Sequence, residues 1–242
     1  MLSLSANELL DVWDRGQGRP QTERALLLLE AVCREADRGE IARWSIGRCD
    51  GLLLTLRERL FGIPIQSVMA CPLCGERLEL DFTTTDIRAA APEAPLLSVS
   101  LDGYEATIRL PDTSDLWAAG AAGDVAAIAR RLLRSCVVRA EYEAGVVECE
   151  DLPDTVVAEI NRRLAEADPQ ADTQIALTCP ACGHAWTALL DIGAFLWAEV
   201  ETWAARTLHG VHRLAAAYGW READILALSP RRRQFYLDLV GE

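Results

Sequence analysis

Two short cysteine motifs are the residues of this chain best suited to chemistry. Each places two cysteines two residues apart, and a tight loop of this kind points both sulfurs at one spot. The motifs, called the knuckles below, are Cys71-Pro72-Leu73-Cys74-Gly75 and Cys179-Pro180-Ala181-Cys182-Gly183. A structural zinc ion takes four thiolate or imidazole ligands in a tetrahedron. The spacing therefore predicts one shared zinc site with the ligands Cys71, Cys74, Cys179 and Cys182.

Other uses of the cysteine pairs remain open at this point. A Cys-x-x-Cys pair can be a redox dithiol when it begins a helix, but here a strand is predicted after each knuckle. The cysteines could also form disulfides or be idle thiols. His184 directly follows the second knuckle, and it could replace a cysteine as ligand, although we interpret it as a surface neighbour.

The similarity of the two knuckles extends into the residues that follow them. Leu78 and Trp186 occupy equivalent positions, and each following run closes on Asp-Ile, at Asp86-Ile87 and Asp191-Ile192. This indicates an internal duplication of a knuckle and a strand. Pairing the copies would make the intervening about 100 residues an insertion, which is acceptable because closure entropy grows only with the logarithm of loop length.

Composition places the chain among acidic globular proteins. Half of its 242 residues are hydrophobic and a quarter are charged, which fits one large domain or two small ones. The net charge is −13, and all 24 basic residues are arginine. Nucleic-acid binding is not expected, because affinity for phosphates comes mainly from clustered cations.

The sequence predicts a cytoplasmic protein. No stretch approaches the roughly 20 apolar residues that cross a bilayer, and no basic region precedes an apolar run at the N-terminus. Thiols stay reduced in the cytoplasm, where cysteine pairs usually bind metal. Cys33, Cys49, Cys136 and Cys149 have no near partner in the sequence and are predicted to be small core residues.

Helices are predicted over the first and last parts of the chain. Ser5 and Glu8 form a capping-box pattern at the first helix, which ends at Gly16 and Gly18. Further apolar periodicity predicts helices at 22–38, 46–60, 112–139 with an interruption near Gly120, 154–167, 192–218, 222–228 and 231–240.

Strands are predicted around the knuckles and at one hairpin. Residues 65–70 lead into the first knuckle and 77–83 leave it with alternating polarity, while 174–178 and 186–191 flank the second. Asp102-Gly103 lies between apolar runs at 97–101 and 104–110, a strong hairpin signal.

These elements define the expected architecture. The fold class is α+β, mainly helical, with a small zinc-bound β element formed by the two knuckles and an additional β-hairpin. The expected regions are an N-terminal helical region (1–66), the paired knuckle and strand units (67–88 and 173–192), an inserted hairpin and helical region (89–172) and a C-terminal helical docking module (193–242).

Catalytic motifs are missing from the sequence. It contains no glycine-rich phosphate loop, no Gly-x-Ser-x-Gly elbow and no His-Glu-x-x-His pair. It has only three histidines, which leaves few candidates for acid–base catalysis. We expect no enzymatic activity and no small-molecule substrate.

Three stretches resemble a known class of proteins. They are the run Ser45–Gly62 before the first knuckle, the second knuckle with the helix after it, and the closing run Leu208–Leu237 with Tyr218-Gly219-Trp220. Together they resemble baseplate or hub-assembly proteins of contractile-tailed phages and contractile injection systems. The closing run is also similar to short modules in phage tail-assembly chaperones. Residues 89–171 add nothing to this resemblance.

The closing run carries the predicted partner-binding residues. It holds too many large apolar groups for a terminal tail to leave in water, so these pack on the body or on a partner. Neighbouring arginines would suit an acidic groove of a partner. The candidates are Trp220, Arg231, Arg232 and Tyr236.

The sequence thus predicts an assembly factor or structural component of a baseplate or injection system, stabilised by one structural Zn²⁺. The resemblance implies baseplate, hub or tail proteins as partners, and it allows incorporation into the particle. The alternative is a zinc-ribbon regulatory or nucleic-acid adaptor protein, which would need a contiguous basic face. An enzyme with an unfamiliar site is the third possibility.

Overall fold

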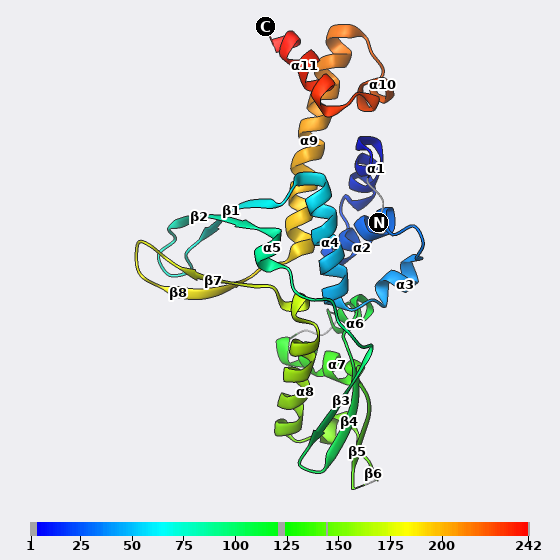
Figure 1. Cartoon of the computed structure of the whole chain (residues 1–242), viewed down its shortest axis with the longest axis vertical. Coiled ribbons are helices and arrows are strands. Elements are labelled where there is room, and N and C mark those ends of the chain that lie inside the picture. The colour runs from blue at the N-terminus through cyan, green and yellow to red at the C-terminus, as the bar shows by residue number, and fades with distance from the viewer. Residues whose placement is uncertain (1–3, 121–123, 144, 242) are drawn as a thin grey trace. The chain divides into compact units, whose positions relative to one another are not determined.

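The computed structural model describes residues 4–120, 124–143 and 145–241 (Figure 1). It confirms the predicted α+β class, with many helices and small antiparallel sheets. The chain divides into two compact units, which are described separately. Residues 1–36 and 193–242 form the end unit, and residues 37–192 form the middle unit.

The end unit is helical. Ser5 and Glu8 form the predicted capping box at its first helix. The second helix ends at Val32 rather than near Arg38, and Cys33 is its C-terminal cap. The helices are α1 (Ala6–Gly16), α2 (Gln21–Val32), most of α9 (Ile192–Tyr218), α10 (Glu222–Ala227) and α11 (Pro230–Gly241).

A close approach of α9 to the end of α1 requires glycine. A Cβ atom at Gly16 would lie 2.1 Å from Cη2 of Trp197. The Trp197 side chain is almost completely buried, and the guanidinium of Arg24 lies 5.0 Å from the centre of its ring. Gly16 therefore both ends the first helix and admits the largest buried side chain of this unit.

The middle unit combines helices with three antiparallel sheets. Its helices are α3 (Arg38–Ala42), α4 (Ile46–Phe61), α5 (Thr84–Ile87), α6 (Thr113–Gly120), α7 (Val125–Cys136), α8 (Asp154–Ala167) and the short turns η1 (Cys149–Asp151) and η2 (Pro169–Asp172). Two hairpins, β1 (Pro64–Ala70) with β2 (Arg77–Thr83) and β7 (Gln174–Thr178) with β8 (Ala185–Leu189), carry the knuckles.

The third sheet lies in the insertion between the hairpins. Its order is β3 (Leu96–Leu101), β4 (Tyr104–Arg109), β5 (Val137–Tyr142) and β6 (Gly145–Val146). The predicted turn is present, with positive φ values of 52° at Asp102 and 82° at Gly103. Strand β5 was not predicted, because the helical pattern of the sequence continues to Arg139. The helix ends at Cys136 instead, and the residues that follow pair with β4.

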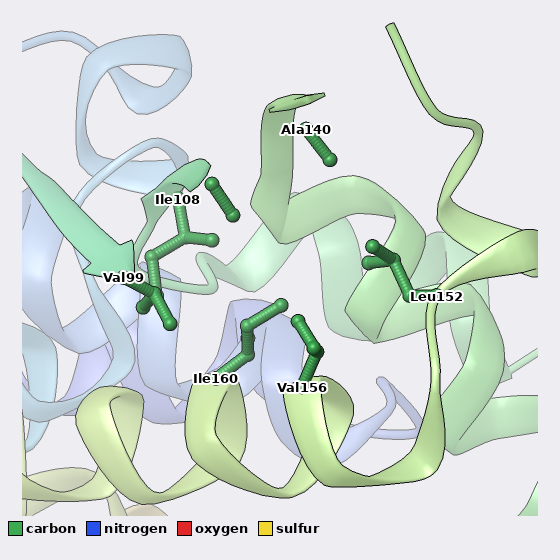
Figure 2. Packing of buried hydrophobic residues seen from close by; sticks show 7 residues of the cluster. Val99, Ile108, Ala140, Leu152, Val156 and Ile160 are labelled. Atoms are coloured by element: carbon green, nitrogen blue, oxygen red, sulfur yellow. The ribbon is translucent and has the colours of Figure 1, made fainter. Parts of the chain in front are cut away.

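Helix α8 and this sheet enclose a hydrophobic core (Figure 2). Figure 2 shows Val156 and Ile160 of α8 pointing toward Val99, Ile108 and Ala140 of the strands. Ile108 and Ile160 are completely buried. The apolar residues of α8 thus cover a sheet of which only the β3–β4 hairpin was predicted.

Candidate metal centre

The structure brings the four knuckle cysteines together. Their sulfur atoms all lie within 4.8 Å of one another. The Sγ atoms of Cys71 and Cys182 are 3.8 Å apart, and those of Cys74 and Cys179 are 3.6 Å apart. A tetrahedral zinc ion with sulfurs at about 2.3 Å requires a sulfur–sulfur spacing of about 3.8 Å. The cluster therefore has the size of a four-thiolate metal site.

The first knuckle is shaped by backbone hydrogen bonds. The N–H of Gly75 donates to the carbonyl of Cys71 at 2.9 Å, and the N–H of Cys71 donates to the carbonyl of Glu76 at 2.8 Å. Gly75 has a φ of +77°, which an L side chain rarely adopts. The loop turns sharply enough to direct both sulfurs the same way.

The second knuckle repeats this geometry. The N–H of Gly183 donates to the carbonyl of Cys179 at 2.9 Å, and the N–H of Cys179 donates to the carbonyl of His184 at 2.8 Å. Gly183 has a φ of +73°. The equivalent residues Leu78 and Trp186 both pack against the buried cysteines. The structure thus supports the duplication that was inferred from the sequence.

Gln170 of η2 joins the bases of the two hairpins. Its Oε1 accepts a hydrogen bond from the N–H of Ala89 at 2.8 Å, just beyond β2 and α5. Its Nε2 donates to the carbonyl of Ile87 at 3.2 Å and to Oγ1 of Thr173 at 2.8 Å, just before β7. The side-chain amide of Gln170 therefore links the bases of the two hairpins, and the four cysteine sulfurs lie together at their knuckles. No sequence motif pointed to Gln170.

Helix α4 holds the first hairpin. The buried guanidinium of Arg57 donates to the carbonyls of Gly62 and Pro64, both at 2.7 Å, where the chain turns from α4 into β1. At the other end of the hairpin, Glu58 accepts hydrogen bonds from Oγ1 of Thr84 at 2.5 Å and from Arg88 at 2.9 Å. The hydrogen-bonded neighbours lower the pKa of Glu58 and keep it charged.

The environment of the sulfurs favours a bound cation. Burial opposes ionisation of Cys71, but the backbone N–H groups of Cys74 and Leu73 outweigh it and lower the pKa of Cys71 to about 7. The N–H of Glu76 favours the Cys74 thiolate, yet the adjacent sulfurs raise the pKa of Cys74 to about 12. Four adjacent thiolates repel one another unless a metal ion lies between them.

The alternatives to metal binding fit the geometry less well. The sulfurs are farther apart than the roughly 2.05 Å of a disulfide, and all eight cysteines are free thiols. A strand, not a helix, follows each knuckle, so the helix N-terminus that activates redox dithiols is not provided. His184 lies outside the sulfur cluster, and its ring stacks on Trp186 with centroids 5.8 Å apart.

The remaining cysteines are core residues to different degrees. Cys49 and Cys136 are buried, as predicted, and burial raises their pKa values to about 12 and about 11. Cys33 and Cys149 are half-buried. Among the described residues, none of these four joins the metal cluster.

The proposed partner-binding residues belong to the end unit. Trp220 and Tyr236 are half-buried, pack against the core of that unit and contact each other edge to face at 5.0 Å. Arg231 and Arg232 are exposed. Packing on the body therefore accounts for the two aromatic residues, while the arginines remain accessible.

Comparison with known families identifies the chain. Residues 17–197, about three quarters of it, match the family described as T4 bacteriophage base plate protein. The chain belongs to the T4 bacteriophage base plate protein family. This confirms the resemblance seen in the sequence and supports a structural role in a phage baseplate, among other baseplate proteins.

The family match includes both knuckles, the stretch Ser45–Gly62 and the whole insertion between the knuckles. It ends before Leu208–Leu237, so the similarity of that run to tail-assembly chaperones stays a prediction. No curated protein and no solved structure matches the chain. In the described part of the chain, no helix has the length and apolar character needed to span a membrane.

Proposed function

We propose that this baseplate-family protein is a non-enzymatic assembly factor or structural component of a phage tail baseplate or contractile injection system, stabilised by one structural zinc. The family match over residues 17–197 supports the baseplate role and carries the proposal. The protein would fold in the cytoplasm and then act during assembly or enter the particle.

Zinc is the metal that the donor set favours. Soft thiolates select zinc, copper(I) or iron–sulfur clusters, and the four sulfurs have tetrahedral spacing. Cys71 and Cys179 are 2% and 1% exposed, so half of the site is shielded from competing ligands. Four thiolates fill the tetrahedron and leave no position for an activated water, which is the arrangement of structural sites.

Helix α11 is the proposed docking element for baseplate, hub or tail proteins. Phe235 is 61% exposed and Leu239 is 49% exposed, and Arg231 and Arg232 lie on the same helix. Exposed apolar groups beside arginines suit a partner surface with acidic residues. Tyr236 of this helix contacts Trp220, and packing of both rings on the core of the end unit would position the helix.

The test of the baseplate role is a tagged pull-down from the native host, analysed by mass spectrometry beside purified particles. Spike, hub, tape-measure or wedge proteins are expected to co-purify, and presence in the particle would distinguish a component from an assembly factor. Recovery of only transcription or ribosomal proteins would contradict the proposal and favour a nucleic-acid adaptor.

The docking helix is tested in the same assay with a charge reversal, Arg231→Glu with Arg232→Glu. We expect this variant to lose its partners because it repels an acidic surface. The matched control, Arg163→Glu with Arg206→Glu, changes the net charge equally at exposed positions and should retain them. Equal recovery of partner proteins with both variants would show that Arg231 and Arg232 of α11 are not part of the interface.

A further inference from the structure

A large groove in the middle unit lies apart from the knuckles. Its cavity volume is about 1030 Å³, and it is lined by residues from the start of α4, the segment 88–96, the end of β4 and Gln170. Cavities of about 300–1,000 Å³ are typical of binding sites. The groove is therefore large enough for several residues of another chain.

Two arginines of the groove are available to a ligand. Arg43 and Arg48 are exposed, and in the described part of the chain neither forms an ion pair. The guanidinium of Arg48 lies 4.1 Å from the centre of the Trp44 ring. Stacking on an aromatic ring orients the planar guanidinium and leaves its edge free to bind a carboxylate.

The other two arginines of the groove are held in ion pairs, and the lining contains few carboxylates. Arg88 pairs with Glu58 at 2.9 Å, and Arg109 binds Asp115 at 2.6 Å. Asp112 accepts a hydrogen bond from the N–H of Asp115. Glu93 is the other carboxylate of the lining, and it is exposed. The groove thus carries an excess of positive charge on a protein whose net charge is −13.

The rest of the lining is mainly apolar. Leu52 and Leu110 line the groove together with the alanine- and proline-rich segment 89–95. Leu96, which begins the edge strand β3, is 52% exposed. An extended peptide could therefore bury aliphatic side chains here while its carboxylates reach Arg43 and Arg48.

We propose that this groove binds an extended acidic segment of another protein through Arg43 and Arg48. A nucleic acid fits less well, because two free arginines offer few phosphate contacts and the acidic protein repels a polyanion. The identity of the occupant as a baseplate protein rests on the proposed function. Binding of a peptide to the groove can be tested independently of that role.

The test is a fluorescence-anisotropy titration of the full chain at low salt. The probes are three labelled ten-residue peptides of alanine, leucine and proline that contain zero, two or four glutamates, and a ten-nucleotide oligo-dT. Affinity is expected to rise with the number of glutamates and to fall with salt. The variant Arg43→Glu with Arg48→Glu should weaken binding of the four-glutamate peptide tenfold or more.

Arg163→Glu with Arg206→Glu is the control of equal net charge and should leave the affinity within about twofold. Circular dichroism melting of each variant verifies that the fold is retained. No binding of any peptide, binding without glutamate dependence, equal loss in both variants or tighter binding of oligo-dT would each overturn the proposal. A negative result in the peptide titration would leave the baseplate role untouched, and a negative pull-down would leave peptide binding by the groove untouched.

Discussion

The paired hairpins and the four-stranded sheet are held together by different interactions. Each brings together segments that are distant in the sequence. The sheet and α8 do so with seven buried residues and nine partly buried ones. Among the described residues, the cluster where the hairpins meet has Leu78 and two cysteines as its buried members, with Leu80 and Trp186 packed beside them.

This difference indicates which region a bound metal would stabilise most. Two-stranded hairpins are marginally stable alone, and a cluster this small adds little hydrophobic stabilisation. Metal binding to a thiolate site can contribute on the order of 10 kcal/mol to folding. We therefore expect the hairpins to depend on metal and the sheet to depend on its apolar core.

The largest expected effect is on the hairpins, in the variant Cys179→Ser. Loss of a buried thiolate ligand should abolish metal binding and separate the knuckles. Metal analysis should show stoichiometric zinc in the wild type and none in the variant. Hydrogen exchange should accelerate in residues 64–83 and 174–189, while α8 and its sheet stay protected.

Cys33→Ser is the control for this experiment, because Cys33 lies in the end unit outside the cluster. It should retain zinc and the exchange pattern of the wild type. If Cys179→Ser keeps its metal, the assignment of the metal to the four knuckle cysteines is wrong. If the sheet loses protection together with the hairpins, the two regions are not independent.

Ile160→Ala perturbs the other region, because it opens a cavity between α8 and the sheet. Ile160 is completely buried, and such truncations cost about 3 kcal/mol. Urea denaturation should show this loss while zinc stoichiometry stays unchanged. Arg163→Ala on the exposed face of the same helix should cost less than about 0.5 kcal/mol. Loss of zinc in Ile160→Ala would contradict the separation of the two regions.

A smaller effect is expected at Asp50 of α4, whose charged neighbours come from both regions. Burial, together with Asp191 beyond β8 and Asp168 beyond α8, raises the pKa of Asp50 to about 7. The folded state then binds a proton that the unfolded chain releases near pH 4. The contribution of Asp50 to stability should therefore fall as pH rises from about 4 to 7 and level off above that range.

Asp50→Asn removes this penalty, so it should raise the free energy of unfolding by a few kcal/mol at pH 8 and change it little at pH 4. Denaturation midpoints across this range measure the difference from the wild type. Asp11→Asn, at an exposed position, is the control and should follow the wild-type curve. A constant difference at all pH values would exclude titration of Asp50 as its cause.

Local signals predicted much of the fold. The capping box at Ser5, the helix at 154–167 and the Asp102-Gly103 turn depend on neighbouring residues, and the structure confirms each. Strand β5 was missed because its residues continue a helical pattern and become a strand through pairing with β4. Tertiary contacts of this kind leave no periodicity in one sequence.

The gathering of the cysteines was predictable because each knuckle supplies two of the four ligands that a structural zinc site needs. The groups that support them were not. Gln170 contacts Ile87 and Ala89 through the fold alone, and the groove around Arg48 combines segments from four parts of the chain. Domain boundaries and partner-binding residues stay predictions, to be tested by the experiments above.

The separation of the knuckles in the sequence has a consequence for biosynthesis. A ribosome adds about 5–20 residues per second, so about 100 residues of synthesis leave the first knuckle waiting several seconds for the second. The sheet and α8 emerge during this interval. A metal ion that needs all four thiolates would therefore be bound completely only after the insertion has been synthesised.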